Sequence, residues 1–215
     1  MRCARTGSRL FARAGVWLLL AAPVARAEGA PRDDKPVAVP PLELHYLQYG
    51  IAFTAEIATL PGPICATAAA PCILGSGGGI AARVGYRFPG PWYIGGAYEF
   101  SKQDPSQLYR LAILQQLRAE ARYYFVTSRI LEPYLGAGLG VAAYGNAWQV
   151  DVWAPIGSVG AGVELQITRT RVIGLAASYR LLYTSRFTDT SNTSRDPGVA
   201  QFFGVDLVLE ARDPI

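Results

Sequence analysis

The 215-residue sequence is poor in the residues that build metal sites and helical cores, because it has one histidine, one methionine and three cysteines. The histidine, His45, lies far in sequence from Cys65 and Cys72, and two thiols are too few for a structural zinc site. Glycine (23), proline (15) and tyrosine (12) are plentiful instead. This composition indicates strands and turns rather than a helical bundle, and we expect no metal or other cofactor.

Long hydrophobic runs are also missing beyond residue 41, although 51% of all residues are hydrophobic and only 17% are charged. No stretch there approaches the roughly 18 apolar residues that a membrane-spanning helix requires. The composition equally excludes a disordered chain, which would carry fewer apolar residues. The apolar residues must therefore be distributed over another kind of element.

The first 27 residues have the three zones of a secretory signal peptide. Arginines lie near the start, residues 14–24 form an apolar run, and Ala25-Arg26-Ala27 supplies the small residues of a cleavage site. A membrane-anchoring helix is the competing interpretation, but the run is much shorter than the roughly 20 residues that span a bilayer. We expect cleavage after Ala27 and export to an oxidising compartment.

The formal net charge of +4 originates in this leader. Five of the 20 lysine and arginine residues lie within positions 1–27, which contain no acid, so 15 basic and 16 acidic residues remain from position 28 onward. The remaining basic residues are not clustered along the sequence. No nucleic-acid partner is therefore expected.

Cys65 and Cys72 are expected to form a disulfide that closes a small loop. They lie seven positions apart in a stretch rich in proline, alanine and glycine. Such a closure is worth about 2.5 kcal/mol in the chain-entropy model. A redox-active pair is the alternative, but the two cysteines do not form a Cys-x-x-Cys motif.

The mature chain divides into a short tail and one β domain. Residues 28–41 contain four prolines among mixed charges and show no periodicity, which predicts a disordered periplasmic tail. Residues 42–215 instead show apolar residues at every second position, as in a strand with one apolar face. Eight strands are predicted, at about residues 45–57, 79–88, 92–101, 111–125, 133–145, 156–167, 171–182 and 199–210.

The connections between these strands alternate in length. The long ones are 58–78, 102–110, 146–155 and 183–198, and the short ones are 89–91, 126–132 and 168–170. Membrane barrels alternate in this way, with short turns in the periplasm and long loops outside. The sequence thus predicts an all-β, eight-stranded antiparallel up-and-down transmembrane β-barrel whose N-terminus is periplasmic.

A soluble lipocalin-like barrel, which has the same alternation turned inside out, is the rival fold. Its polar face would carry many lysine, glutamate, threonine and serine side chains, whereas the mature chain has only two lysines, Lys35 and Lys102. The polar face here consists mainly of glycine, arginine and acidic residues. This composition suits the interior of a narrow membrane barrel.

Ten charged side chains are predicted to lie in that interior, where glycines leave room for them. Five arginines and five acids can pair, as a filled interior requires, because an isolated buried charge is very costly. Eight strands leave an interior only wide enough to be filled, so a plugged lumen is favoured over a charged conducting path. The predicted network consists of Glu56, Arg83, Arg87, Glu99, Arg118, Glu120, Arg122, Glu164, Arg180 and Asp206.

Aromatic residues are predicted to form two belts where lipid meets water. One belt flanks the short turns and the other flanks the long loops. The first contains Phe88, Trp92, Tyr123, Phe125 and Tyr134, and the second contains Tyr98, Phe100, Tyr109, Tyr144, Trp148, Trp153, Tyr179 and Tyr183.

Two segments, QLRAEARYYF at 116–125 and PYLGAGLGVAAY at 133–144, resemble the small outer-membrane β-barrels of Gram-negative bacteria, a group with OmpA-like, OmpX-like and OmpW-like members. The resemblance covers about residues 42–210. It implies a barrel in the outer membrane, with outer-membrane lipid and the barrel assembly machinery as partners. Such proteins commonly end in an aromatic residue, whereas this chain ends in Ile215, so either the machinery tolerates a tail here or the last strand is misplaced.

The favoured function is structural or interactive, with surface ligands or other outer-membrane proteins meeting the long loops. A small channel or transporter for small or hydrophobic solutes is the alternative. Apolar residues on the inner face near the outer end, such as Ala52, Ala97, Ala142 and Phe202, weakly favour it. The paired charges deeper in the barrel argue against free flow.

A lipid-modifying enzyme is the third possibility. Acyl transfer usually needs a base beside a nucleophile. The single histidine, His45, lies at the periplasmic start of the first strand, whereas Ser76, the nearest serine in sequence, lies on the outer loop. No enzymatic activity and no catalytic residue are expected.

Overall fold

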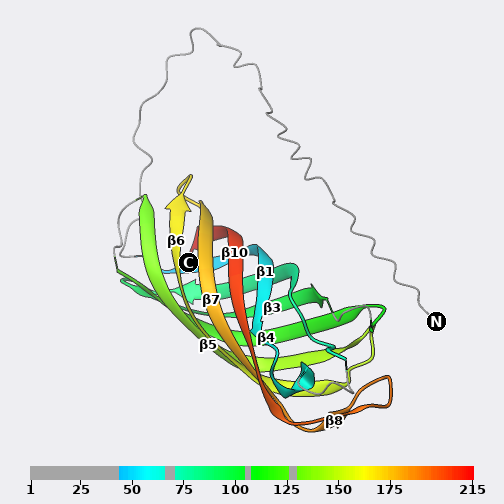
Figure 1. The fold of residues 1–215 in the computed structure, drawn as a ribbon. Coiled ribbons are helices and arrows are strands. Elements are labelled where there is room, and N and C mark those ends of the chain that lie inside the picture. Colours follow the sequence, from blue (N-terminus) through cyan, green and yellow to red (C-terminus); the bar gives the residue numbers. More distant parts are fainter. Residues whose placement is uncertain (1–43, 66–70, 105–107, 126–129) are drawn as a thin grey trace, which may run out of the picture. The chain divides into compact units, whose positions relative to one another are not determined.

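A computed structural model describes residues 44–65, 71–104, 108–125 and 130–215 of the chain. The predicted signal peptide, its cleavage at Ala27 and the predicted tail at 28–41 lie outside these residues. Among the described residues, no helix has both the length and the apolar character needed to cross a membrane. The strands form a closed barrel, whose tilted arrows are drawn in Figure 1.

Eight long strands build the barrel, and the predicted all-β, eight-stranded antiparallel architecture is confirmed. Each strand pairs antiparallel with its neighbours along the chain, and β1 pairs with both β2 and β10, which closes the ring. The strands are β1 (Tyr46–Leu60), β2 (Gly77–Arg87), β3 (Trp92–Gln103), β4 (Ala112–Tyr124), β5 (Leu131–Asn146), β6 (Val152–Gln166), β7 (Arg171–Thr184) and β10 (Gly198–Pro214).

Three short elements lie in the connections. A 3-10 helix, η1 (Gly62–Cys65), follows β1, and the strands β8 (Phe187–Thr188) and β9 (Ser194–Arg195) pair as a hairpin between β7 and β10. Asn192 in this hairpin has a φ of 65°, and Asp189 accepts hydrogen bonds from the backbone amides of Ser191 and Thr193. Asparagine tolerates this left-handed conformation better than most residues, which explains its place in the turn.

The strand ends differ most from the predicted ones in two places, by four residues each. β10 continues to Pro214 rather than ending near residue 210, because Gln48 and Leu47 of β1 pair with Arg212 and Asp213. β6 begins at Val152, so the connection after β5 spans only 147–151 instead of 146–155. The last strand therefore uses almost the whole C-terminal segment of the chain.

The connections divide the barrel into two ends. The long-loop end carries the connections 61–76, 104–111, 147–151 and 185–197, and the short-turn end carries 88–91, 125–130 and 167–170. The third of the connections predicted to be long, 147–151, is shorter than 125–130, so the predicted alternation in length does not hold there. The start of β1 and the end of β10 both lie at the short-turn end.

The outer wall of the barrel is apolar and exposed, whereas the inner wall is polar and buried. Leu117, Leu139 and Val159 point outward with exposed fractions of 57%, 75% and 62%, and the residues beside Leu117 in sequence, Gln116 and Arg118, are buried inside. Exposing so much apolar surface to water would be strongly unfavourable. The arrangement is that of a barrel surrounded by lipid.

Candidate functional site

All ten side chains of the predicted charge network lie inside the barrel, on inward positions of its strands, and each takes part in at least one ion pair. Three further charges join them: Glu132 on β5 and Glu210 and Arg212 on β10. The interior thus holds the six arginines Arg83, Arg87, Arg118, Arg122, Arg180 and Arg212 and the seven acids Glu56, Glu99, Glu120, Glu132, Glu164, Asp206 and Glu210.

Arg180 on β7 lies at the centre of the part of the charge network that is nearest the long-loop end. Its Nη1 atom lies 2.7 Å from a carboxylate oxygen of Glu56 and 2.7 Å from one of Glu99, and its Nη2 atom lies 3.3 Å from Asp206. All four side chains are almost completely buried. One guanidinium therefore neutralises acids from β1, β3 and β10 and connects three strands across the lumen.

Glu120 occupies the middle of the network. Its carboxylate lies 3.8 Å from Arg83, 3.5 Å from Arg118 and 3.6 Å from Arg122, which are longer distances than those around Arg180. A cavity of about 50 Å³ lies beside these four side chains. It is large enough to hold water but far too small to form a pore.

Arg122 and Arg212 link the charges nearest the short-turn end. Arg122 lies 2.9 Å from Glu164 and 3.1 Å from Glu210. Arg212 pairs with Glu132 at 3.0 Å and also contacts Glu164. The extension of β10 beyond residue 210 is what brings Arg212 into the lumen.

Three tyrosine rings pack among these charges. Arg87 lies 3.8 Å from the ring centre of Tyr124, and Arg122 lies 4.5 Å from that of Tyr93. The prediction that Tyr134 belongs to the short-turn belt is wrong, because its side chain points inward beside Tyr124 and is buried.

Glycines make room for these rings. A Cβ atom on Gly85 would lie 2.4 Å from Cζ of Tyr93, and a Cβ atom on Gly162 would lie 2.5 Å from Cζ of Tyr134. Both distances are shorter than any carbon contact allows. The small residues of the polar face are therefore required by the tyrosines as well as by the charges.

The interior at the long-loop end is apolar rather than charged. Buried residues from β4, β5, β6, β7 and β10 surround residues of the first loop there. The cluster comprises Ile64, Ile73, Leu74, Tyr109, Ala112, Leu114, Ala142, Tyr144, Val152, Ala154, Ile156, Leu182, Phe187, Ala200 and Phe202.

The first and last loops form a cap over this cluster. We use "cap" for η1, residues 71–74 and the β8–β9 hairpin. The predicted disulfide between Cys65 and Cys72 is present and ties the two parts of the first loop together. Ile64 and Ile73, which adjoin the two cysteines, are buried, and the Tyr144 hydroxyl donates to the Ile73 carbonyl.

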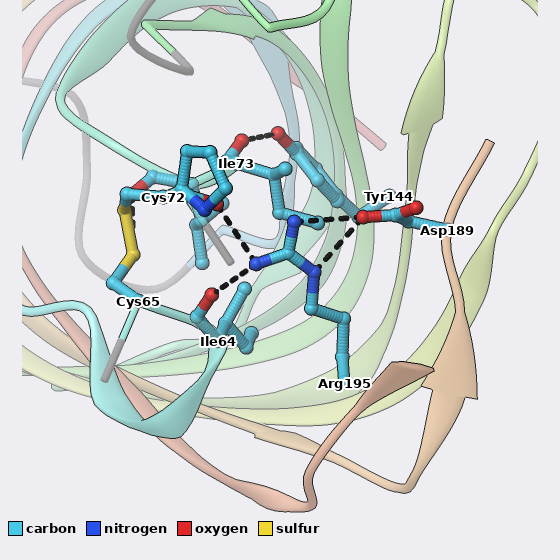
Figure 2. Close-up of a disulfide and its surroundings, with 9 residues drawn as sticks. Ile64, Cys65, Cys72, Ile73, Tyr144, Asp189 and Arg195 are labelled. Atoms are coloured by element: carbon cyan, nitrogen blue, oxygen red, sulfur yellow. Dashed lines mark hydrogen bonds and ion pairs between the residues drawn. A yellow bond between two sulfur atoms is a disulfide. The ribbon is translucent and has the colours of Figure 1, made fainter. Parts of the chain in front are cut away.

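Arg195 holds the cap together, as Figure 2 shows. Its Nη1 atom donates to the carbonyl oxygens of Ile64 at 2.9 Å and Pro71 at 2.8 Å, which are the residues just before the two cysteines. Its Nε and Nη2 atoms donate to Asp189 at 2.9 and 2.7 Å. One buried guanidinium therefore joins the disulfide-closed loop to the β8–β9 hairpin.

The Asp189 carboxylate is held in its charged form. Burial acts to raise its pKa, but hydrogen bonds from Ser191, the Thr193 amide and Arg195 outweigh burial and hold the pKa of Asp189 below its ordinary value. Nearby, burial and the hydrogen bond to Asp151 raise the pKa of Tyr109.

Acidification is expected to loosen the cap. The pKa of Asp189 is lower in the folded state than in the unfolded state, so the ionised carboxylate stabilises the cap. This stabilisation is complete above about pH 4 and is lost as the pH falls through the pKa of Asp189 in the folded state. Amide hydrogen exchange at Ile73 and Leu74, compared at pH 7 and pH 3 after correction for intrinsic rates, measures this loss. The Asp189→Asn variant should have a loose cap at both pH values, and an unchanged pH dependence in that variant would assign the effect to another group.

The aromatic residues that remain on the outer wall form the two expected groups. Phe88, Trp92, Tyr123 and Phe125 are exposed near the short-turn end, and Tyr98, Trp148, Trp153, Tyr179 and Tyr183 are exposed near the long-loop end. Tyr109 and Tyr144, which were expected in the second belt, are instead buried and stacked on each other beneath the cap.

His45 forms a hydrogen bond with a tyrosine of the neighbouring strand β2. Its Nδ1 atom shares a hydrogen bond of 2.5 Å with the Tyr86 hydroxyl at the short-turn end. The described residues contain no group of three or more histidine, cysteine or acidic side chains placed to hold a metal ion.

No protein-family model matches the sequence, and no curated protein matches it. Solved structures are similar in fold. The outer membrane protein AlkL, determined by solid-state NMR in DMPC bilayers, is 14% identical, with 85% of this chain and 97% of AlkL covered and a TM-score of 0.50. Neisserial surface protein A is 22% identical (80% and 97% covered, TM-score 0.48), and OprG from Pseudomonas aeruginosa is 12% identical (79% and 96% covered, TM-score 0.45). At these identities the likeness concerns the fold, which is that of a small eight-stranded outer-membrane β-barrel.

Proposed function

We propose that this eight-stranded barrel is a closed outer-membrane protein that conducts no solute and works through contacts made at its long-loop end. The exposed apolar wall and the likeness in fold to outer-membrane proteins support this location. The predicted leader and the start of β1 at the short-turn end favour a periplasmic N-terminus. The long-loop end then faces the outside of the cell.

Two successive seals in the lumen carry this proposal. The first is the ion-paired network, in which single arginines such as Arg180 reach acids on several strands. The second is the apolar cluster beneath the cap, in which Ile73 and Leu74 fill the space between the walls. An open channel would require both seals to be broken, and separating buried ion pairs costs several kcal/mol for each pair.

A closed lumen leaves the outer surface as the place of function. The disulfide and the Arg195 contacts give the cap a fixed shape, which favours recognition because little conformational entropy is lost on binding. Surface ligands and neighbouring outer-membrane proteins are the partners that this end would meet. The barrel assembly machinery would meet β10, whose pairing with β1 continues to Pro214.

Planar-bilayer conductance tests the proposal. The protein, expressed as the full chain and recovered folded from membranes, should insert without producing discrete current steps, and heat-dependent gel mobility would verify that it is folded. The Arg195→Leu variant, which breaks the second seal alone, should remain silent because the ion pairs persist. Reproducible channel steps from the unaltered protein would instead support the alternative function of a small-solute channel.

A further inference from the structure

A groove of about 380 Å³ lies on the barrel at the long-loop end of β3. Lys102 from β3, Arg110 from the next loop and Ser76 from the first loop line it, together with the carboxylate-bearing residue Asp104. Lys102 occupies an outward position of its strand, between Gly78 of β2 and Ile113 of β4. The buried residues Gln103, Tyr109 and Ala112 also line the groove, so it lies at the rim of the barrel, with Lys102 approaching from the outer wall.

Two cations, Lys102 and Arg110, line this groove together with a single carboxylate, that of Asp104. Lys102 and Arg110 are both exposed, and neither forms an ion pair with any other residue that the structure describes. This contrasts with the interior, where every arginine is paired, and with Arg186 on the last loop, which lies 3.4 Å from Asp196. Ser76 accepts a hydrogen bond from the Ala58 amide at 3.1 Å and retains its own hydroxyl proton for donation.

The outer wall of β3 is aromatic on the side of Lys102 that faces the middle of the membrane. Phe100 and Tyr98 follow Lys102 on the outward face of β3, toward the middle of the membrane. The ring of Trp148, which is 80% exposed, lies 6.3 Å from that of Phe100. From the loop end toward the bilayer centre, the outer wall therefore presents a cation, then aromatic rings, then aliphatic side chains. The three regions of a lipid follow the same order, with the phosphate first, the glycerol or sugar next and the acyl chains last.

We propose that this groove binds the phosphate of an anionic membrane lipid, with Lys102 and Arg110 as the charge partners, Ser76 as a hydrogen-bond donor, and Phe100 and Trp148 in contact with the lipid's apolar part. The inference rests on the proposed membrane location and goes beyond the proposed closed lumen. Two exposed cations hold a free phosphate ion weakly in water, whereas a phosphate fixed at the membrane surface is presented to them at high local concentration. A lipid is therefore the occupant that both the charges and the aromatic wall favour.

Lipid binding by the full chain, purified in a neutral detergent, tests the proposal. Native mass spectrometry would count bound molecules of a diphosphorylated lipid A, with phosphatidylcholine as the neutral reference. Each cation near an anionic lipid surface strengthens binding about fivefold, so the Lys102→Gln/Arg110→Gln variant should bind lipid A about 25-fold more weakly. The Arg169→Gln/Arg186→Gln variant removes the same net charge elsewhere and should lose less than about threefold.

Several results would overturn the proposal. They are unchanged lipid A binding by the Lys102→Gln/Arg110→Gln variant, equal losses in both double variants, and retention of phosphatidylcholine as strong as that of lipid A. Inorganic phosphate at millimolar concentration should displace little lipid, and complete displacement would identify a free anion as the occupant. This experiment measures lipid binding and not conductance. Failure of the lipid-site proposal can therefore be distinguished from failure of the proposed closed lumen.

Discussion

The Arg180→Leu variant is expected to lose about 3–5 kcal/mol of unfolding free energy. Arg180 neutralises Glu56, Glu99 and Asp206 within a few ångströms, and leucine would leave these buried carboxylates with fewer partners. Urea unfolding from lipid vesicles, followed by tryptophan fluorescence and gel mobility, measures the loss. The effect should exceed that of a leucine substitution at Arg83 or Arg212, because each of these pairs with two acids whereas Arg180 pairs with three.

Two further variants separate the buried ion pairs from a general effect of charge. Arg186→Leu removes an exposed partner of Asp196, with side chains 72% and 62% exposed, and should cost less than about 0.5 kcal/mol. The Arg180→Leu/Glu99→Gln double variant should recover part of the stability, because one uncompensated carboxylate is removed. If Arg180→Leu is no more harmful than Arg186→Leu, the ion-paired interior does not contribute to stability as described.

The Arg195→Leu variant is expected to open the cap while leaving the barrel folded. The substitution removes the donors to the Ile64 and Pro71 carbonyls and leaves Asp189 buried without its cation. Loss of one partner of a buried pair costs about 3–5 kcal/mol, so amide exchange in residues 72–74 should accelerate by about a hundredfold or more. Hydrogen exchange with residue-level resolution measures this change.

The effect of Arg195→Lys should be intermediate. A lysine ammonium can pair with Asp189, but it lacks the planar fork that reaches Asp189 and both loop carbonyls together. Global unfolding of both variants should change much less than the exchange rates in the cap, because the interior ion pairs lie deeper in the barrel. Unaltered exchange in the Arg195→Leu variant would show that the disulfide alone positions the first loop.

Alternation along the sequence was sufficient to predict the strands and to locate the interior charges within them. It missed Glu210, although this residue is the last of a predicted strand, and it missed Glu132 and Arg212, which lie beyond the predicted strand ends. Glu132 precedes Pro133, a residue that normally interrupts a strand, and Arg212 lies between Ala211 and the charged Asp213. Both are drawn into the barrel by pairing with a neighbouring strand, which period-two patterns do not record.

The cap was inaccessible to sequence reasoning for a different reason. The spacing of Cys65 and Cys72 predicted their bond, but nothing near them indicates a partner for Arg195, which lies more than a hundred residues away. The same applies to Tyr109 and Tyr144. Their aromatic character suggested a lipid-facing belt, whereas the first loop folds inward and covers them. Contacts between loops follow from closure of the barrel and not from local periodicity.

The most direct test of the inverted arrangement, with charges inside and apolar residues facing lipid, uses spin labels on the outer wall. Labels would be placed at Leu117, Leu139 and Val159 in the protein carrying Cys3→Ser, with Arg186 as the loop control. In lipid bilayers, relaxation at the three wall positions should respond to oxygen and resist a water-soluble nickel chelate, while the Arg186 position should respond to nickel. Strong relaxation by nickel at all four positions would place the apolar face in water and contradict a membrane barrel.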